Sequence, residues 1–179
     1  MRLFAPTITL LATLLLSTPS DACTVSLRVA RDATVSFNGI QCNNNTVPCS
    51  SIPLGLDNTL TSFKGNRDYR RILLGFDLPT NAPTGCVLRI PNTQDGLPVD
   101  VAVVRTDDTW DEQTVSGYTK RLDGSVVGST TTGSLDVTGA CKDAVNHKLS
   151  FFVDTNKDMV TFNSVQSGSP AVFSLDYSF

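Results

Sequence analysis

Apolar and polar residues alternate along most of the chain after residue 23, in short runs that polar turns separate. Period-two alternation over several residues is typical of half-buried β-strands. On this basis we predict about ten strands. They cover residues 25–37, 58–63, 72–78, 86–90, 99–105, 117–121, 125–130, 134–137, 147–154, 159–164 and 171–177.

One predicted strand and one predicted helix stand out. The run ILLGFDL at residues 72–78 is apolar on both faces, which indicates a buried central strand. Residues 136–146 predict at most one short helix, since Asp136 or Thr138 can cap its first turn. Short strands that recur at a spacing of about 8–12 residues are typical of sandwiches and barrels. The sequence therefore predicts an all-β protein with the architecture of a β-sandwich.

The first 22 residues have the layout of a secretory signal peptide. Arg2 supplies a positive charge, residues 8–16 are apolar, and small residues precede a cleavage point after Ala22. The apolar run is too short to span a membrane. We therefore expect a signal peptide at residues 1–22 and a secreted, extracellular, single-domain protein at residues 23–179.

Charge and composition narrow the class of partner. The formal net charge is −3, which argues against nucleic acid. Of the 17 acidic residues only Glu112 is a glutamate. Aspartate favours turns and loops whereas glutamate favours helices, so this bias agrees with an all-β fold. We expect a monomer that binds neither nucleic acid nor membrane.

Five cysteines follow the signal: Cys23, Cys42, Cys49, Cys86 and Cys141. In a secreted chain they are first of all disulfide candidates. We favour Cys86 with Cys141, and Cys42 with Cys49, although five choices of the odd cysteine and three pairings of the rest leave about fifteen arrangements open. The odd cysteine is free, bonded to another chain, or removed if cleavage falls after it.

The loop CNNNTVPCSSIP at residues 42–53 is polar and carries two prolines. It contains the N-glycosylation sequon Asn44-Asn45-Thr46. We predict a glycan at Asn44, which would place this loop at the surface.

Catalytic patterns are weak in this sequence. His147 is the only histidine, and no Gly-x-Ser-x-Gly elbow accompanies it. Carboxylates crowd only in DDTWDE, residues 107–112, which we interpret as a loop that Trp110 anchors to the core. A structural Ca²⁺ ion suits these carboxylates better than a glycosidase acid pair does. Beyond such an ion we expect no metal and no cofactor, and we expect the protein not to be an enzyme.

The segment KGNRDYRR at residues 64–71 concentrates basic side chains in an acidic protein. Guanidinium groups bind carboxylates in bidentate fashion, and Tyr69 offers a ring for stacking on a sugar. Neighbouring residues of a strand point to opposite faces, so Arg70 and Arg71 cannot both join one surface. The alternative is a solvated hairpin tip, or arginines that pair with aspartates.

These segments resemble a known family. RRILLGFDL at residues 70–78 resembles the RR-x-L-x-x-F-D-L core of the DNRLRE-type domains, which include carbohydrate-binding module family 96. Similar segments follow in the family's order at residues 103–115, 135–138, 149–151 and 160–164. The resemblance implies a β-sandwich of jelly-roll type that binds polysaccharide through Lys and Arg, with acidic polymers such as alginate among its ligands.

Together, the residues and the resemblance predict a non-catalytic module that binds cell-wall polysaccharide, with polyuronate favoured. The candidate carbohydrate-binding residues are Lys64, Arg67, Tyr69, Arg70, Arg71 and Tyr177, with Arg28 and Arg31 as weaker additions. One alternative is an extracellular interaction protein with a protein partner, which the odd cysteine favours. Another is a polysaccharide lyase or hydrolase.

Overall fold

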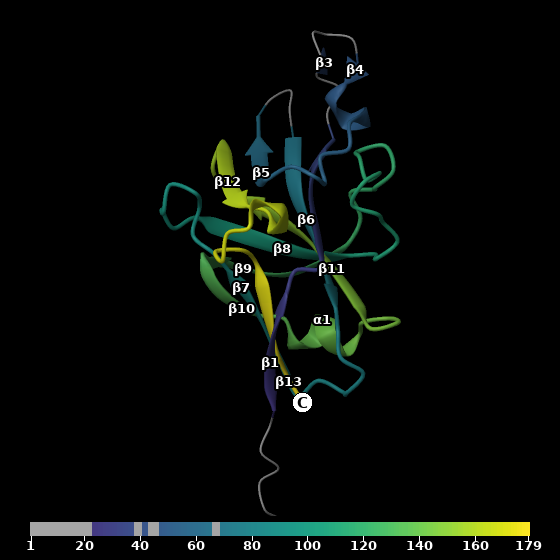
Figure 1. The fold of residues 1–179 in the computed structure, drawn as a ribbon, viewed down its shortest axis with the longest axis vertical. Coiled ribbons are helices and arrows are strands. Elements are labelled where there is room, and N and C mark those ends of the chain that lie inside the picture. The colour runs from purple at the N-terminus through teal and green to yellow at the C-terminus, as the bar shows by residue number, and fades with distance from the viewer. Residues whose placement is uncertain (1–22, 38–40, 43–46, 66–68) are drawn as a thin grey trace, which may run out of the picture.

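The computed structural model describes residues 23–37, 41–42, 47–65 and 69–179, with only the backbone for residues 41–42. The predicted signal peptide, the Asn44 sequon and Arg67 lie outside these described residues. The described chain forms two large antiparallel sheets that pack against each other (Figure 1). This arrangement confirms the predicted all-β sandwich.

The smaller sheet brings the two ends of the described chain together. Its four strands lie in the order β1-β13-β7-β10, and β1 runs beside β13 in Figure 1. Their bounds are Thr24–Arg28 for β1, Ser174–Ser178 for β13, Gly85–Ile90 for β7 and Gly133–Asp136 for β10.

The larger sheet has seven strands in the order β12-β5-β6-β11-β8-β9, with β2 also paired to β6. Their bounds are Arg31–Ser36 for β2, Thr59–Lys64 for β5, Tyr69–Asp77 for β6, Asp100–Thr106 for β8, Ser125–Thr131 for β9, Lys148–Thr155 for β11 and Met159–Asn163 for β12. The remaining elements are a ribbon of β3 (Gln41–Cys42) and β4 (Val47–Pro48), the 3₁₀ turns η1 (Cys49–Ser51) and η2 (Val165–Ser167), and the helix α1 (Thr138–Lys142).

The central strand β6 is buried on both faces, as its apolar sequence predicts. Ile72 and Phe76 point into the main core between the sheets, where Leu88 and Leu175 of the smaller sheet also lie. Leu73 points the other way, into a second core on the outer face of the larger sheet. The members of that second core are Ala33, Val35, Leu73, Trp110, Val115 and Phe152.

Two strand predictions are wrong. Residues 25–37 form two strands instead of one, because the chain leaves the smaller sheet after β1 and enters the larger sheet at β2. The backbone amides of Val29 and Ala30 mark this crossing, since they donate to Phe173 and to Gly75 respectively. Residues 117–121 form turns instead of a strand. The described chain has thirteen strands where about ten are predicted, and these thirteen include the two-residue strands β3 and β4, which lie outside every predicted range.

The predicted short helix is confirmed as α1, which is shorter than residues 136–146. The predicted cap is wrong, because Val137 occupies the N-cap position and makes no side-chain cap hydrogen bond. The carboxylate of Asp136, one residue earlier, accepts a hydrogen bond from the Thr138 amide at 2.9 Å. Among the described residues, none of the helices is long and apolar enough to cross a membrane.

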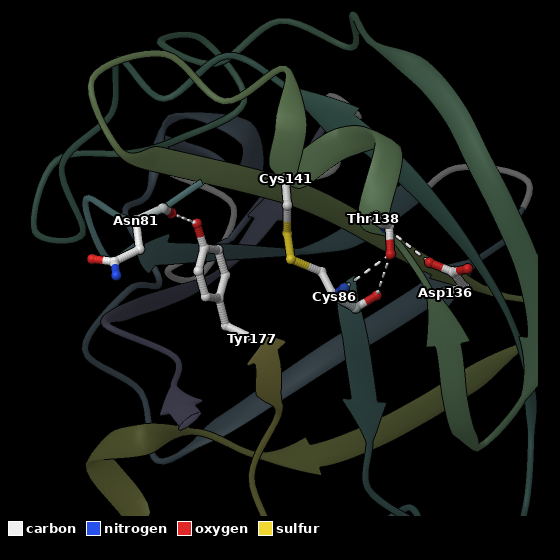
Figure 2. Close-up of a disulfide and its surroundings, with 6 residues drawn as sticks. All are labelled: Asn81, Cys86, Asp136, Thr138, Cys141 and Tyr177. Atoms are coloured by element: carbon white, nitrogen blue, oxygen red, sulfur yellow. Dashed lines mark hydrogen bonds between the residues drawn. A yellow bond between two sulfur atoms is a disulfide. The ribbon is translucent and has the colours of Figure 1, made fainter. Parts of the chain in front are cut away.

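The predicted disulfide between Cys86 and Cys141 is confirmed, and it ties β7 to α1 (Figure 2). Thr138 reinforces the same junction, since its hydroxyl accepts a hydrogen bond from the Cys86 amide at 2.9 Å. Cys49 also takes part in a disulfide, while the side chain of its predicted partner Cys42 lies outside the described part. Cys23 is free and exposed.

Candidate functional site

The basic segment is divided by the β5–β6 pairing. Lys64 ends β5 and lies opposite Tyr69 on β6, while Phe63 lies opposite Arg70. Tyr69 and Arg71 therefore share one face of β6, and Arg70 belongs to the other face. Lys64 is exposed, whereas Tyr69 and Arg70 are half-buried. The cluster predicted from the sequence does not form one surface.

Arg71 is a structural residue. Its side chain is buried, and its Nε lies 2.7 Å from Oδ1 of Asp154 on β11. Its guanidinium also lies 4.3 Å above the centre of the Phe152 ring, within the range of a cation–π contact. Because Arg71 is only 5% exposed, it cannot contact a ligand at the surface, which corrects its predicted role.

Tyr177 is also removed from the predicted site by burial. The side chain is 1% exposed and packs in the main core. Its hydroxyl donates to the backbone carbonyl of Asn81, beside the disulfide (Figure 2). A ring in this position has no free face for a sugar, so the prediction that Tyr177 stacks on the ligand is wrong.

The two weaker candidates, Arg31 and Arg28, each donate a hydrogen bond to a backbone carbonyl. Arg31 donates to the carbonyl oxygen of Trp110 at 2.6 Å, and its guanidinium lies 4.6 Å from the Trp110 ring centre. Arg28 lies on β1 in the other sheet and donates to the Ser169 carbonyl oxygen at 3.2 Å. Neither arginine lies with Lys64 and Tyr69.

Lys64 and Tyr69 do meet in a groove, which we call the cross-strand groove. It has a volume of about 300 Å³ and is lined by residues from β5, β6, β11, β8 and β9, five consecutive neighbours in the larger sheet. Adjacent strands lie about 4.8 Å apart, so five strands span roughly 19 Å. The polar side chains that line it are Lys64, Tyr69, Asp100, Ser129, Asp154 and Asn156, together with Ser62 and Thr155.

Hydrogen bonds hold the carboxylates of the cross-strand groove in place. Asp154 Oδ1 accepts from the hydroxyl of Tyr69 at 3.3 Å as well as from Arg71. Asp100 accepts from the Thr131 hydroxyl at 2.8 Å and from the Asn156 amide at 2.9 Å. The groove therefore presents fixed polar groups, which reduces the ordering that a ligand must impose.

Tyr69 remains an uncharged phenol in this setting. Burial raises the pKa of its hydroxyl, Arg71 nearby lowers it, and Asp154 raises it again, with a net pKa above the ordinary value. A neutral phenol keeps its hydrogen bond to Asp154 and retains an oxygen lone pair that can accept from a ligand.

The sequence reasoning missed the aspartates of this groove. Asp154 and Asp100 lie at the ends of β11 and β8, and both strands carry polar residues at their ends. Many aspartates in this chain follow or precede strands, so nothing in the local sequence marks these two. Only the sheet order, in which β11 lies between β6 and β8, brings them to Tyr69.

A second and larger groove, the Arg105 groove, lies at the opposite ends of β8 and β11. It has a volume of about 790 Å³ and is lined by Arg105, Thr106, Asp107, Asp108, Thr109, Asp123, Gly124, Ser125, Val145, Asn146 and Lys148. Two of its charged side chains already have partners within the protein. Arg105 donates a hydrogen bond to the Asp143 carbonyl, and Asp107 forms an ion pair with the buried Lys120. None of the predicted ligand residues that the structure describes lines it.

The segment at residues 107–112 serves as the predicted anchoring loop. Trp110 is buried and its indole N–H donates to Ser150 at 2.9 Å. Glu112 accepts from the Asp32 amide at 2.7 Å.

Burial raises the pKa of Asp107, but hydrogen bonds from Lys120 and Thr109 outweigh the effect of burial and lower the pKa to about 2. A carboxyl group with this pKa stays ionised near neutral pH, which does not suit a general acid.

No arrangement of three or more His, Cys, Asp or Glu side chains suited to a metal ion occurs among the described residues. The structural Ca²⁺ ion that the sequence allows at residues 107–112 therefore has no such cluster in the described part of the chain.

The comparison with known proteins gives one informative match. The chain is 29% identical over 164 residues to a protein of Arthroderma benhamiae named "Uncharacterized secreted protein", and the match covers 82% of each chain. No family model matches this chain, so the resemblance to DNRLRE-type domains stays a prediction.

Proposed function

We propose that this chain is a secreted, non-catalytic module that binds an extended polysaccharide in the cross-strand groove. The observation that carries the proposal is that five neighbouring strands contribute residues to the groove, which offers a sugar chain several polar contacts. Tyr69 supplies an aromatic edge, while Lys64, Asp100 and Asn156 supply donors and acceptors. Aromatic contacts combined with fixed polar groups are typical of small-molecule and sugar sites.

Secretion is part of the same proposal. The signal-peptide pattern at residues 1–22, the disulfides and the similarity to a secreted protein all support an extracellular location. A module in that location would gain affinity from repeated contacts along a polymer, because each exposed polar contact is weak.

Affinity electrophoresis tests the proposal. The mature protein is run through gels that contain alginate, polygalacturonate or a soluble β-glucan, alongside variants Lys64→Ala and Asn156→Ala. Both residues are exposed, so neither change should disturb the core. The matched control is Lys142→Ala, an exposed lysine of α1 outside the groove.

Retardation of the wild type and the control by at least one polymer, with reduced retardation of both groove variants, is the expected result. Free migration of the wild type in every gel would overturn the proposal. Equal retardation of wild type and groove variants would keep polysaccharide binding but move it to another surface, with the Arg105 groove as the next candidate.

A second candidate function is an extracellular interaction protein. Its supporting observation is that Cys23 is free and exposed beside β1, which is an edge strand of the smaller sheet. A thiol at this position allows a disulfide to another chain. Comparison of reducing and non-reducing gels of the secreted protein would reveal such a bond, and a monomer under both conditions would remove this support.

A further inference from the structure

We infer that the cross-strand groove selects an uncharged sugar chain, recognised through its hydroxyl groups, over a polyuronate. This inference rests on the proposed function, and it concerns the chemical class of the ligand at the same groove. The sequence favours an acidic polymer because basic residues concentrate at 64–71. The structure changes the balance of charge, since it buries one of those arginines and adds two aspartates to the groove.

The ion pair between Arg71 and Asp154 contributes no free positive charge. The Arg71 guanidinium lies under the groove, where its Nε is bonded to Asp154 and its plane covers the Phe152 ring. A ligand in the groove meets the carboxylate of Asp154, whose side chain is 24% exposed, before it meets the 7% exposed side chain of Arg71. The positive charge that the sequence offers to a uronate is used to neutralise Asp154.

Among the described residues, no basic side chain forms an ion pair with Asp100. The carboxylate is exposed, and its two donors, the Thr131 hydroxyl and the Asn156 amide, are both uncharged. Each carboxylate oxygen can accept more than one hydrogen bond, so both oxygens keep a lone pair for a ligand. The residue therefore presents a negative charge and spare acceptors to the groove.

Sugar hydroxyls and uronate carboxylates differ in how they meet these acceptors. A hydroxyl can donate to Asp100 or Asp154 and accept from Lys64 at the same time. A uronate carboxylate is only an acceptor, so beside Asp100 it places two like charges close together with no proton between them. The arrangement of acceptors therefore favours hydroxyl groups.

Lys64 does not reverse this preference. It is the one basic side chain among the described residues that line the groove, and it is exposed at the end of β5. An exposed ion pair is weak and is screened by salt. The lysine instead provides a donor for a sugar hydroxyl or ring oxygen, in the same groove as the acceptors of Asp100 and Asp154.

The test compares a soluble neutral β-glucan with polygalacturonate as ligands of the mature protein and of Asp100→Asn, in low and in high salt. The substitution removes the charge and keeps the shape at an exposed position. The control is Asp57→Asn, an exposed aspartate outside the groove. Thermal unfolding followed by the fluorescence of Trp110 verifies that each variant is folded.

We expect the wild type to bind the β-glucan about tenfold or more tightly than polygalacturonate, with less than about a twofold change between the two salt concentrations. Asp100→Asn should strengthen polygalacturonate binding severalfold in low salt, while Asp57→Asn should not. Tighter binding of polygalacturonate by the wild type, weakened by salt and unaffected by Asp100→Asn, would overturn the inference and leave the proposed function standing. Binding of neither polymer would overturn both.

Discussion

Arg71 and Asp154 form an ion pair across β6 and β11 in which the arginine is buried and the aspartate reaches the surface. The Nε–Oδ1 distance is 2.7 Å, and the two side chains are 7% and 24% exposed. The pair connects the second core, through the contact of Arg71 with Phe152, to the cross-strand groove, through Asp154. The same interaction that stabilises the sheet therefore positions a groove carboxylate.

Loss of Arg71 should be costly for stability. In Arg71→Leu the partly buried Asp154 keeps its charge without its partner, and we expect a loss of about 2–4 kcal/mol in the free energy of unfolding. Urea unfolding followed by Trp110 fluorescence measures it. The matched control is Arg89→Leu, because Arg89 and Asp176 have the same 2.7 Å contact while Arg89 is 52% exposed.

For the Arg89→Leu control the loss should be about 0–1 kcal/mol, as for other exposed ion pairs. Equal losses in the two variants would contradict the structural role of Arg71. The double variant Arg71→Leu with Asp154→Leu should recover part of the loss, because no uncompensated charge then remains.

Asp32 should make stability depend on pH. It is fully buried, and burial raises its pKa, hydrogen bonds from Val165 and Ser164 lower it, and the charge of Glu112 raises it, to about 6 in the folded protein. A folded pKa above the ordinary value of 3.8 means that the native state binds the proton more tightly than the unfolded chain does. Protonation of Asp32 therefore stabilises the fold as pH falls from about 7 towards about 4.

Between pH 7 and pH 5 this single group should add about 1 kcal/mol to the free energy of unfolding. The measurement is urea unfolding at both pH values for the wild type and for Asp32→Asn, in which the side chain cannot ionise. The gain should shrink by that amount in the variant. An identical pH dependence in the two proteins would exclude Asp32 as its source.

The sequence predicts much of this fold because its strands are amphipathic and its turns polar. The central strand of residues 72–78 is recognisable since Ile72 and Leu73 face two different cores, which demands apolar residues at consecutive positions. The division of residues 25–37 is not recognisable in this way. Both halves alternate with the same period, and only partners distant in sequence, Phe173 and Gly75, show where the chain changes sheet.

The candidate site is predicted less well, for a physical reason. Alternation tells which neighbours share a face, but the sequence does not say which face a charged residue takes. Arg71 can be buried because it forms an ion pair with Asp154 and a cation–π contact with Phe152. Both partners lie on a strand about eighty residues away in the sequence. The sequence predicts Lys64 and Tyr69 as ligand residues from the basic segment that contains them, and both line the groove. It misses the aspartates that add negative charge to the groove.

The Cys86–Cys141 disulfide should contribute strongly to stability. It closes a loop with a sequence separation of 55 residues, which the chain-entropy relation converts to about 4 kcal/mol. The paired substitution Cys86→Ala with Cys141→Ala should lower the free energy of unfolding by about that amount. Cys23→Ser is the control, since Cys23 is free and exposed, and it should change stability by less than about 0.5 kcal/mol. A similar loss for both would contradict the assigned pairing.

The most direct test of the central claim is a titration of the ¹⁵N-labelled mature protein with a soluble neutral β-glucan oligosaccharide, followed by amide chemical shifts. Binding in the cross-strand groove predicts the largest saturable changes at Lys64, Tyr69, Asp100 and Asn156, which meet there from four strands or their ends. The amides of Arg105 and Lys148, in the other groove, should stay constant. Changes confined to Arg105 and Lys148, or no change at saturating oligosaccharide, would contradict the claim.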